Sequence, residues 1–593
     1  MGRRWRRGLL GSTLAGLATA ACGSQPGPPV SNPGAAVQAA PSAAAVAARA
    51  PVAAGAAPLR LWSVEEGRAG LVVAASVPSL DRSLTTAAEL ARPVSPMPID
   101  PQSLRALLLG QVGLPPDASQ ALDAGSPIGA VLVTIQPGRD PGVALAVGAR
   151  SGELAEKAVA ALGRVVSRRG EARQVENAAG GRIWLWRSGD VVVIADSAEA
   201  LERGGRLALE ARRGGAEDAT AVFYPDAIAR HAGTDVQIAL GRASALVTEG
   251  DPASQEIQRD FLSRVADAQT GEIALRLDAV KGITIAARLH ARPGSTLARD
   301  AREATPAVID PLLLRGDDIV AVGGSSYGSF AMRAMQVQRQ RIAASQAPGA
   351  AAALRFMDAV MASDGGQMSI VLRGMSGLVL DGVNGIKDAA AAAKLQAALL
   401  GLDKAAITVL AGGSGAAPPE IIAIKKEKIG KIQALTYSMR FDVKGSASAE
   451  RGPDFARALG TEKLDGAAAV IGTRLVFATG PDAKARLAAL AAGGAPPAKK
   501  VPPPDLAAAV AESTGRDGFF FADLARLAPR FAAVAPGPQA AALARLKTPI
   551  PIHGTYGGDG KGDVMTFELR LPKAAFTGLG AALQTVMGMG GPS

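Results

Sequence analysis

The chain has 593 residues, of which 48% are hydrophobic and 20% charged. This length is too great for one hydrophobic core and corresponds to about three to four domain-sized units. The composition excludes a wholly disordered or fibrous protein. No apolar run approaches the ~20 residues that cross a bilayer. A single cysteine excludes a disulfide framework, and three scattered histidines argue against a metal site, so no cofactor is expected.

The first 21 residues have the pattern of an export signal. Arginines at positions 3, 4, 6 and 7 precede a short apolar stretch from Leu9 to Ala21. This stretch is too short for a membrane-spanning helix and has the length of a signal-peptide core. It ends in small residues directly before Cys22, the only cysteine of the chain.

The sequence Thr19-Ala20-Ala21-Cys22 resembles the lipobox of bacterial lipoproteins. The resemblance implies that a signal peptide, residues 1–21, is cut between Ala21 and Cys22. It also implies that the sulfur of Cys22 is joined to diacylglycerol. Thr19 departs from the family, which usually has leucine at that position. An ordinary export signal with a chance cysteine remains the alternative.

The residue after the cysteine bears on which membrane the anchor enters. In bacterial lipoproteins an aspartate there often holds the protein at the inner membrane, and Gly23 therefore favours the outer membrane. The whole pattern is similar to large envelope lipoproteins of GC-rich Gram-negative bacteria, whose folded body lies in the periplasm or at the cell surface. Residues 22–58 are then the lipidated cysteine and a disordered Ala/Pro-rich tether, because they bury too little apolar surface to offset ordering.

The positive charge of the chain is dispersed. Removing the four signal arginines from the net charge of +11 leaves +7, which favours anionic surfaces without defining a nucleic-acid site. Nucleic acid is not expected as a partner of an exported protein. The densest basic cluster is Lys425-Lys426-Glu427-Lys428 with Lys431. It either meets lipid phosphate, lipopolysaccharide or an acidic partner, or it protects a strand edge from pairing. Protection of the edge is the favoured interpretation.

Three kinds of element recur along the chain, which predicts an internal duplication. They are an apolar strand followed by a polar corner and a helix, a pair of alternating strands, and a hairpin that runs into a capped helix. The hairpins are expected at 183–194 and 468–477. The order of the kinds predicts a first half at 59–305 and a second half at 306–593. The alternative is that an Ala-rich sequence inflates self-similarity.

Hairpins and helices in this order predict an α+β fold. We expect mainly antiparallel sheets, each covered by helices on one face, because the strands alternate between apolar and polar residues.

The sharpest candidate for catalysis is Gly324-Ser325-Ser326-Tyr327-Gly328, which fits the nucleophile-elbow pattern after an apolar strand. His553 follows in the order of a hydrolase triad, and Asp381 or Asp442 could orient it. The same strand and corner recur elsewhere without the motif, and the neighbouring strands form hairpins rather than a parallel sheet. A serine hydrolase that uses Ser326 and His553 is therefore not the favoured function.

The sequence favours a non-catalytic, lipid-anchored cell-envelope protein that acts as an interaction or scaffold module. Its expected partners are the membrane, through the anchor, and an envelope protein or lipid. The alternative is a periplasmic carrier of a hydrophobic ligand, which predicts an apolar cavity between sheet and helices.

The lipobox predicts that Cys22 carries fatty chains. Cells grown with radiolabelled palmitate should yield a labelled mature protein, and a Cys22→Ser variant should be unlabelled and released from membranes, because one sulfur holds the whole anchor. An unlabelled native protein, released as freely as Cys22→Ser, would contradict the prediction.

Overall fold

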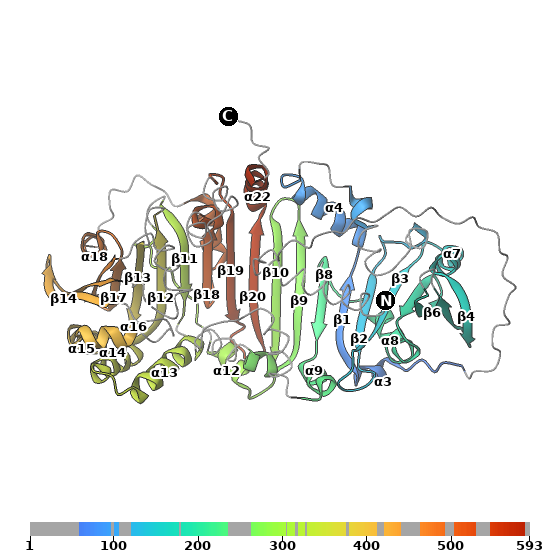
Figure 1. Cartoon of the computed structure of the whole chain (residues 1–593), viewed down its shortest axis with the longest axis horizontal. Coiled ribbons are helices and arrows are strands. Elements are labelled where there is room, and N and C mark those ends of the chain that lie inside the picture. Colours follow the sequence, from blue (N-terminus) through green and yellow to red (C-terminus); the bar gives the residue numbers. More distant parts are fainter. Residues whose placement is uncertain are drawn as a thin grey trace, which may run out of the picture. The chain divides into compact units, whose positions relative to one another are not determined.

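The structure is a computed structural model that describes most of the chain after the predicted tether (Figure 1). The described residues are 58–95, 100–105, 120–176, 180–234, 262–303, 305–314, 318–326, 329–374, 379–411, 420–440, 463–492, 503–528 and 546–586. Two compact units are present. The first is Met1–Thr85 with Asp100–Ala221, and the second is Thr86–Ile99 with Val222–Ser593.

The first unit is built on strands with helices between them. Its helices are α3 (Val64–Arg68), α7 (Gly152–Leu162) and α8 (Ala198–Ala211), and α4 (Leu80–Ala91) begins in it. Its strands are β1 (Leu71–Val77), β2 (Ile128–Val133), β3 (Gly142–Gly148), β4 (Arg164–Arg169), β5 (Ala172–Glu176), β6 (Arg182–Ser188), β7 (Val191–Ala195) and most of β8 (Ala219–Phe223).

The strands of this unit pair in the order β4–β5–β6–β7–β3–β2–β1–β8, and the pairs from β4 to β1 are antiparallel. Helices cover both faces of its middle strands, and β3 and β7 are buried at every residue. Helix α7 packs on the face that carries Leu145 and Ile194. Helix α8 packs on the other face, where Gly204 lies against Ala144 and Val131. The expectation of helices on one face does not hold for these strands.

The second unit contains the remaining elements. Its helices are α9 (Pro225–Ala232), α12 (Thr296–Arg302), α13 (Ser329–Ala344), α14 (Ala350–Ala362), α15 (Ala389–Leu400), α16 (Lys404–Ala411), α18 (Ala483–Ala491), α19 (Pro504–Glu512) and α22 (Lys573–Val586). Its strands are β9 (Ala268–Asp278), β10 (Gly282–Ala291), β11 (Ile319–Ser325), β12 (Asp364–Arg373), β13 (Val379–Ile386), β14 (Glu420–Ile429), β15 (Ile432–Arg440), β16 (Lys463–Ile471), β17 (Arg474–Thr479), β18 (Gly518–Asp523), β19 (Pro551–Gly558) and β20 (Val564–Pro572).

The strands of the second unit form one continuous antiparallel ladder. Their order is β9–β10–β20–β19–β18–β11–β12–β13–β17–β16–β15–β14. Near β17 both faces are covered: α18 and α19 share a core with Val476 and Ala478, whereas α14 to α16 share a core with Leu475. Neighbouring residues along β17, such as Leu475 and Val476, therefore point into different cores.

The pairing scheme of the lower-numbered strands recurs in the higher-numbered ones. Seven strand pairs recur when each strand number is raised by ten. They are β1–β2, β2–β3, β3–β7, β4–β5, β5–β6, β6–β7 and β9–β10, which recur as β11–β12, β12–β13, β13–β17, β14–β15, β15–β16, β16–β17 and β19–β20. A register shift lies between Leu71 and Val73 in β1 and again between Ile319 and Ala321 in β11. The turns after β6 and β16 both begin with a left-handed glycine, Gly189 with φ 63° and Gly472 with φ 59°.

The chain is thus a mixed α+β protein with a large antiparallel sheet, and this part of the sequence-based prediction is confirmed. In the part of the chain that the structure describes, no helix combines the length and apolar character needed to cross a bilayer.

Candidate functional site

The predicted anchor cannot be placed in the fold, because Ala21 and Cys22 lie outside the described residues. The candidate nucleophile Ser326 and the candidate base His553 are both described, and both are buried.

The ladder keeps Ser326 and His553 apart. His553 lies opposite Phe521, which lies opposite Val322. Ser326 is four residues beyond Val322 on the chain, where its N–H donates to the carbonyl of Asp517 at 2.6 Å. Four residues of a strand span about 13 Å, so the two side chains do not meet. Strand β11 is also antiparallel to both of its neighbours, whereas a nucleophile elbow follows a strand of a parallel sheet.

The polar partner of His553 is a carboxylate that the sequence did not single out. Nε2 of His553 lies 2.9 Å from Oε2 of Glu512, and Arg570 donates to the same carboxylate. Of the two candidate orienting acids, Asp381 binds two arginines instead, and Asp442 lies outside the described residues. Glu512 lies at the end of α19 and His553 lies in β19, 41 residues further along the chain. No local sequence spacing could therefore have paired them.

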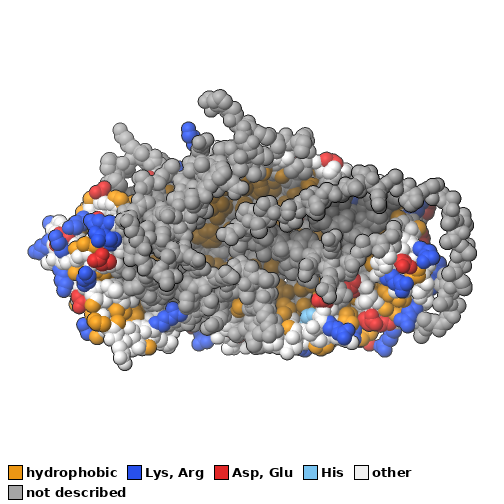
Figure 2. All heavy atoms as spheres, in the orientation of Figure 1, with side chains coloured by type: hydrophobic (Ala, Val, Ile, Leu, Met, Phe, Trp, Pro, Cys, Tyr) orange, Lys and Arg blue, Asp and Glu red, His pale blue; other side chains and the backbone are white. Residues whose placement is uncertain are grey.

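One face of the central strands is apolar, and we call it the central apolar face. A single row of opposed residues crosses it from β9 to β11: Leu275, Ile285, Leu569, Gly554, Phe520 and Gly323. The next row of the same face contains Phe567 and Tyr556, whose rings stack with centroids 6.2 Å apart. Figure 2 shows hydrophobic side chains between the grey atoms near the middle of the view.

Among the described residues of these two rows, Phe520 is exposed, with 43% of its surface accessible. Glycines oppose it on both neighbouring strands, Gly554 on β19 and Gly323 on β11. The ring leans over Gly554, where an added Cβ would be 2.2 Å from Cε1 of Phe520. The ring therefore has no side chain directly beside it in its row and stands available for contact.

The opposite face of the same strands is charged. Arg288 pairs with Glu272, and Arg570 pairs with both Glu568 and Glu512. Side chains directly opposite in antiparallel strands point to the same face, so these ion pairs lie on the face away from Phe520. The central strands thus have one apolar and one polar face, as antiparallel sheets commonly do.

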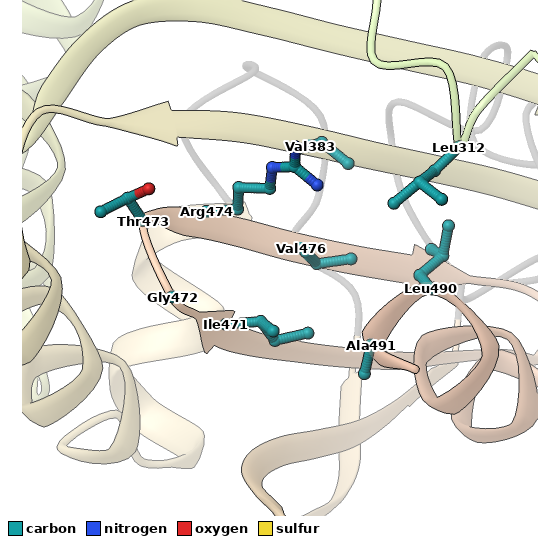
Figure 3. Close-up of a pocket in the computed structure, with 9 residues that line it drawn as sticks. All are labelled: Leu312, Val383, Ile471, Gly472, Thr473, Arg474, Val476, Leu490 and Ala491. Carbon is teal, nitrogen blue, oxygen red and sulfur yellow. The ribbon is translucent and has the colours of Figure 1, made fainter. Parts of the chain in front are cut away.

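A small cavity lies on β13 and β17, beneath α18. It has a volume of about 350 Å³ and is lined mainly by apolar side chains, among them Val383, Val476 and Leu490. Figure 3 shows Leu312 and Leu490 at one end and Arg474 extended over β17 toward Val383. The guanidinium of Arg474 already pairs with Asp310 at 3.4 Å. The volume is at the lower limit of cavities that hold small molecules.

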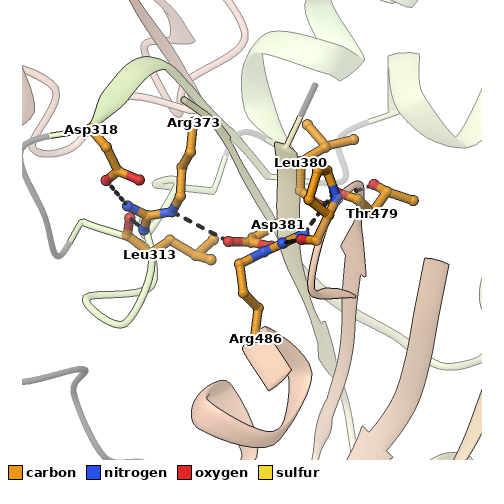
Figure 4. A network of polar contacts seen from close by, with 8 residues as sticks. Leu313, Asp318, Arg373, Leu380, Asp381, Thr479 and Arg486 are labelled. Atoms are coloured by element: carbon orange, nitrogen blue, oxygen red, sulfur yellow. Dashed lines mark hydrogen bonds and ion pairs between the residues drawn. The ribbon is translucent and has the colours of Figure 1, made fainter. Parts of the chain in front are cut away.

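A buried ion network lies on the same face of the sheet as this cavity (Figure 4). The carboxylate of Asp381, on β13, accepts hydrogen bonds from Arg373 at 3.3 Å and from Arg486 at 2.9 Å. Arg373 also pairs with Asp318 at 2.9 Å and donates to the carbonyl of Leu313. Because Arg486 belongs to α18, the network ties that helix to the sheet and is structural.

The corresponding positions of the first unit are apolar. Asp381 lies opposite Val371, two positions from the Arg373 end of the β12–β13 ladder. At the same distance from the end of the β2–β3 ladder, Ala144 lies opposite Val131, and Val133 takes the place of Arg373. At this position of the ladder the first unit has apolar residues where the second has an ion network.

No family model, curated protein or solved structure matches the chain. Among the described residues, no group of three or more His, Cys, Asp and Glu side chains could hold a metal ion.

The network predicts a large cost for loss of its central carboxylate. Asp381→Ala leaves two arginines without their shared partner, and Arg373 is only 9% exposed. We expect the free energy of unfolding, measured in urea, to fall by about 3–5 kcal/mol.

The matched control copies the first unit. Arg373→Val combined with Asp381→Ala recreates the pair Val133 and Ala144 and should recover part of the loss. A urea midpoint unchanged by Asp381→Ala alone would show that the network does not stabilise the fold.

Proposed function

We propose that the protein is a lipid-anchored envelope protein that works by binding, and that the central apolar face receives an apolar segment of another envelope protein. Exposure of Phe520 on a broad apolar sheet face carries the proposal. Phe567 at one end of this face packs against the core that contains Leu297 and Ala301 of α12, so the proposed contact is with the part of the face around Phe520. An exposed aromatic ring on an apolar surface is typical of protein interfaces. The lipobox resemblance and the tether supply the location.

Catalysis has less support. Ser326 and His553 lie on different rows of the ladder, and His553 is engaged by Glu512. The acids of the charged face are likewise engaged by arginines. These contacts describe a stabilised sheet rather than a set of groups aimed at one reacting atom.

A carrier of a hydrophobic ligand is the second candidate. The cavity on β13 and β17 favours it, because apolar side chains line most of its surface. Its volume would accommodate only a small ligand or part of an acyl chain, and this makes the carrier the weaker proposal.

An internal duplication of the halves 59–305 and 306–593 also belongs to the proposal. Two observations support it: the recurring order of strand pairs and the register shift found in both β1 and β11. The shift lies at the first paired residues of both ladders, which supports a common origin over an accidental likeness of Ala-rich segments.

Photocrosslinking in living cells tests the proposed function. The photoreactive residue p-benzoylphenylalanine replaces Phe520, and a second protein carries it at Val280, which is 79% exposed in the β9–β10 turn. We expect a discrete protein adduct from position 520 and none from position 280, because only the first lies on the apolar face.

The product distinguishes the two candidates. A lipid adduct at position 520 would favour the carrier instead of the interaction module. No adduct, or the same adducts from both positions, would contradict both.

A further inference from the structure

The last hairpin of the ladder in the second unit carries a group of unpaired cations. Strand β14 pairs only with β15 among the described strands, so one of its edges is free of strand partners there. Four exposed lysines lie on this strand and its turn, and we call them the basic hairpin: Lys425, Lys426, Lys428 and Lys431. Figure 2 shows blue side chains gathered at the end of the molecule where Figure 1 labels β14.

The acids near the basic hairpin form their ion pairs with cations other than its four lysines. Glu427 binds Lys484 and accepts from Thr436, and both contacts lower the pKa of its carboxyl group. Glu420 pairs with Arg440 at 3.6 Å, and Asp465 pairs with Lys463 at 3.2 Å. Among the described residues, none of the four lysines has an ion-pair partner, so they present a concentrated positive charge.

The equivalent hairpin of the first unit, β4–β5, uses its cations differently. Arg164 pairs with Glu176, and Arg173 pairs with Glu156. Arg169 lies over the ring of Trp184, 6.0 Å from its centroid. Among the described residues, Arg168 is the exposed cation of the first hairpin without an ion-pair partner, whereas the second hairpin has four. Protection of a strand edge explains charges on both hairpins, but it does not explain this difference.

An exposed apolar side chain accompanies these lysines. The register of β14 shifts between Ile421 and Ala423, and Ile422, at the shift, is 38% exposed. Ile422 precedes Lys425 by three residues on the same strand, or about 10 Å. Lysines and an exposed aliphatic group on one strand match a membrane interface, where ammonium groups meet phosphates and the apolar group enters the headgroup region.

We propose that the basic hairpin docks on the anionic surface of a membrane, with its lysines against the phosphates of lipid headgroups. Lysine suits this role because its compact charge meets many phosphate geometries, whereas arginine favours a fixed bidentate one. This contact goes beyond the proposed function and does not depend on Cys22. It would hold the tethered body down on the bilayer.

Vesicle flotation tests the contact. The full mature chain with Cys22→Ser, which has no lipid of its own, is mixed with vesicles of phosphatidylglycerol and phosphatidylcholine. We expect binding that weakens with salt and is absent on pure phosphatidylcholine. Replacing the four lysines by glutamate should lower the partition coefficient at least tenfold, since each lysine near an anionic surface contributes about a factor of five.

The controls separate docking from the other roles of charge. Arg168→Glu with Arg169→Glu, in the first unit's hairpin, should leave binding unchanged. Replacing the four lysines by arginine should retain vesicle binding, because the positive charge remains. If the glutamate variant has a lower thermal midpoint, replacement of the four lysines by glutamine is used instead and should also weaken binding. Glutamate protects an edge as well as lysine does, so a purely protective role predicts no change in flotation. Unchanged flotation of the glutamate variant would overturn the proposal. So would release of the protein from vesicles by inorganic phosphate, if it exceeds the release by chloride at equal ionic strength.

Discussion

The antiparallel ladder is the constraint on which the rest of the structure depends. Its register decides which side chains share a face, because opposed residues point the same way and neighbours along a strand point apart. The row from Leu275 to Gly323 is apolar for this reason, and the ion pairs of Arg288 and Arg570 lie behind it. A shift of one residue in β20 would exchange the two faces.

The same ladder supports different chemistry along its length. Around β3 and β17 helices cover both faces, and the interior is filled either by Ala144 against Gly204 or by Asp381 between two arginines. In the central strands the apolar face keeps Phe520 accessible. Other residues of the central strands are buried, among them Phe519 and Phe521 against α19 and Leu289 and Met565 against α12.

The sequence predicts the kinds of element well, because periodicity is local. The hairpins expected at 183–194 and 468–477 are β6–β7 and β16–β17. The helix layers are less predictable, since the small apolar residues of β3 fit burial on one face or on both. The three phenylalanines Phe519–Phe521 show no alternation of apolar and polar residues in the sequence. The strand pairing, in which Phe520 lies opposite Gly323 and Gly554, is needed to place Phe520 on the apolar face. Glu512 was missed because its partner His553 comes from another element.

The most direct measurement of the exposed face uses single cysteines, because Cys22 is the only native one. In a Cys22→Ser background, Phe520→Cys and Phe521→Cys place a thiol at adjacent positions that are 43% and 2% exposed. We expect rapid modification by a water-soluble maleimide at position 520 and strong protection at position 521. Equal protection of both thiols, or equal reactivity, would contradict the open apolar face.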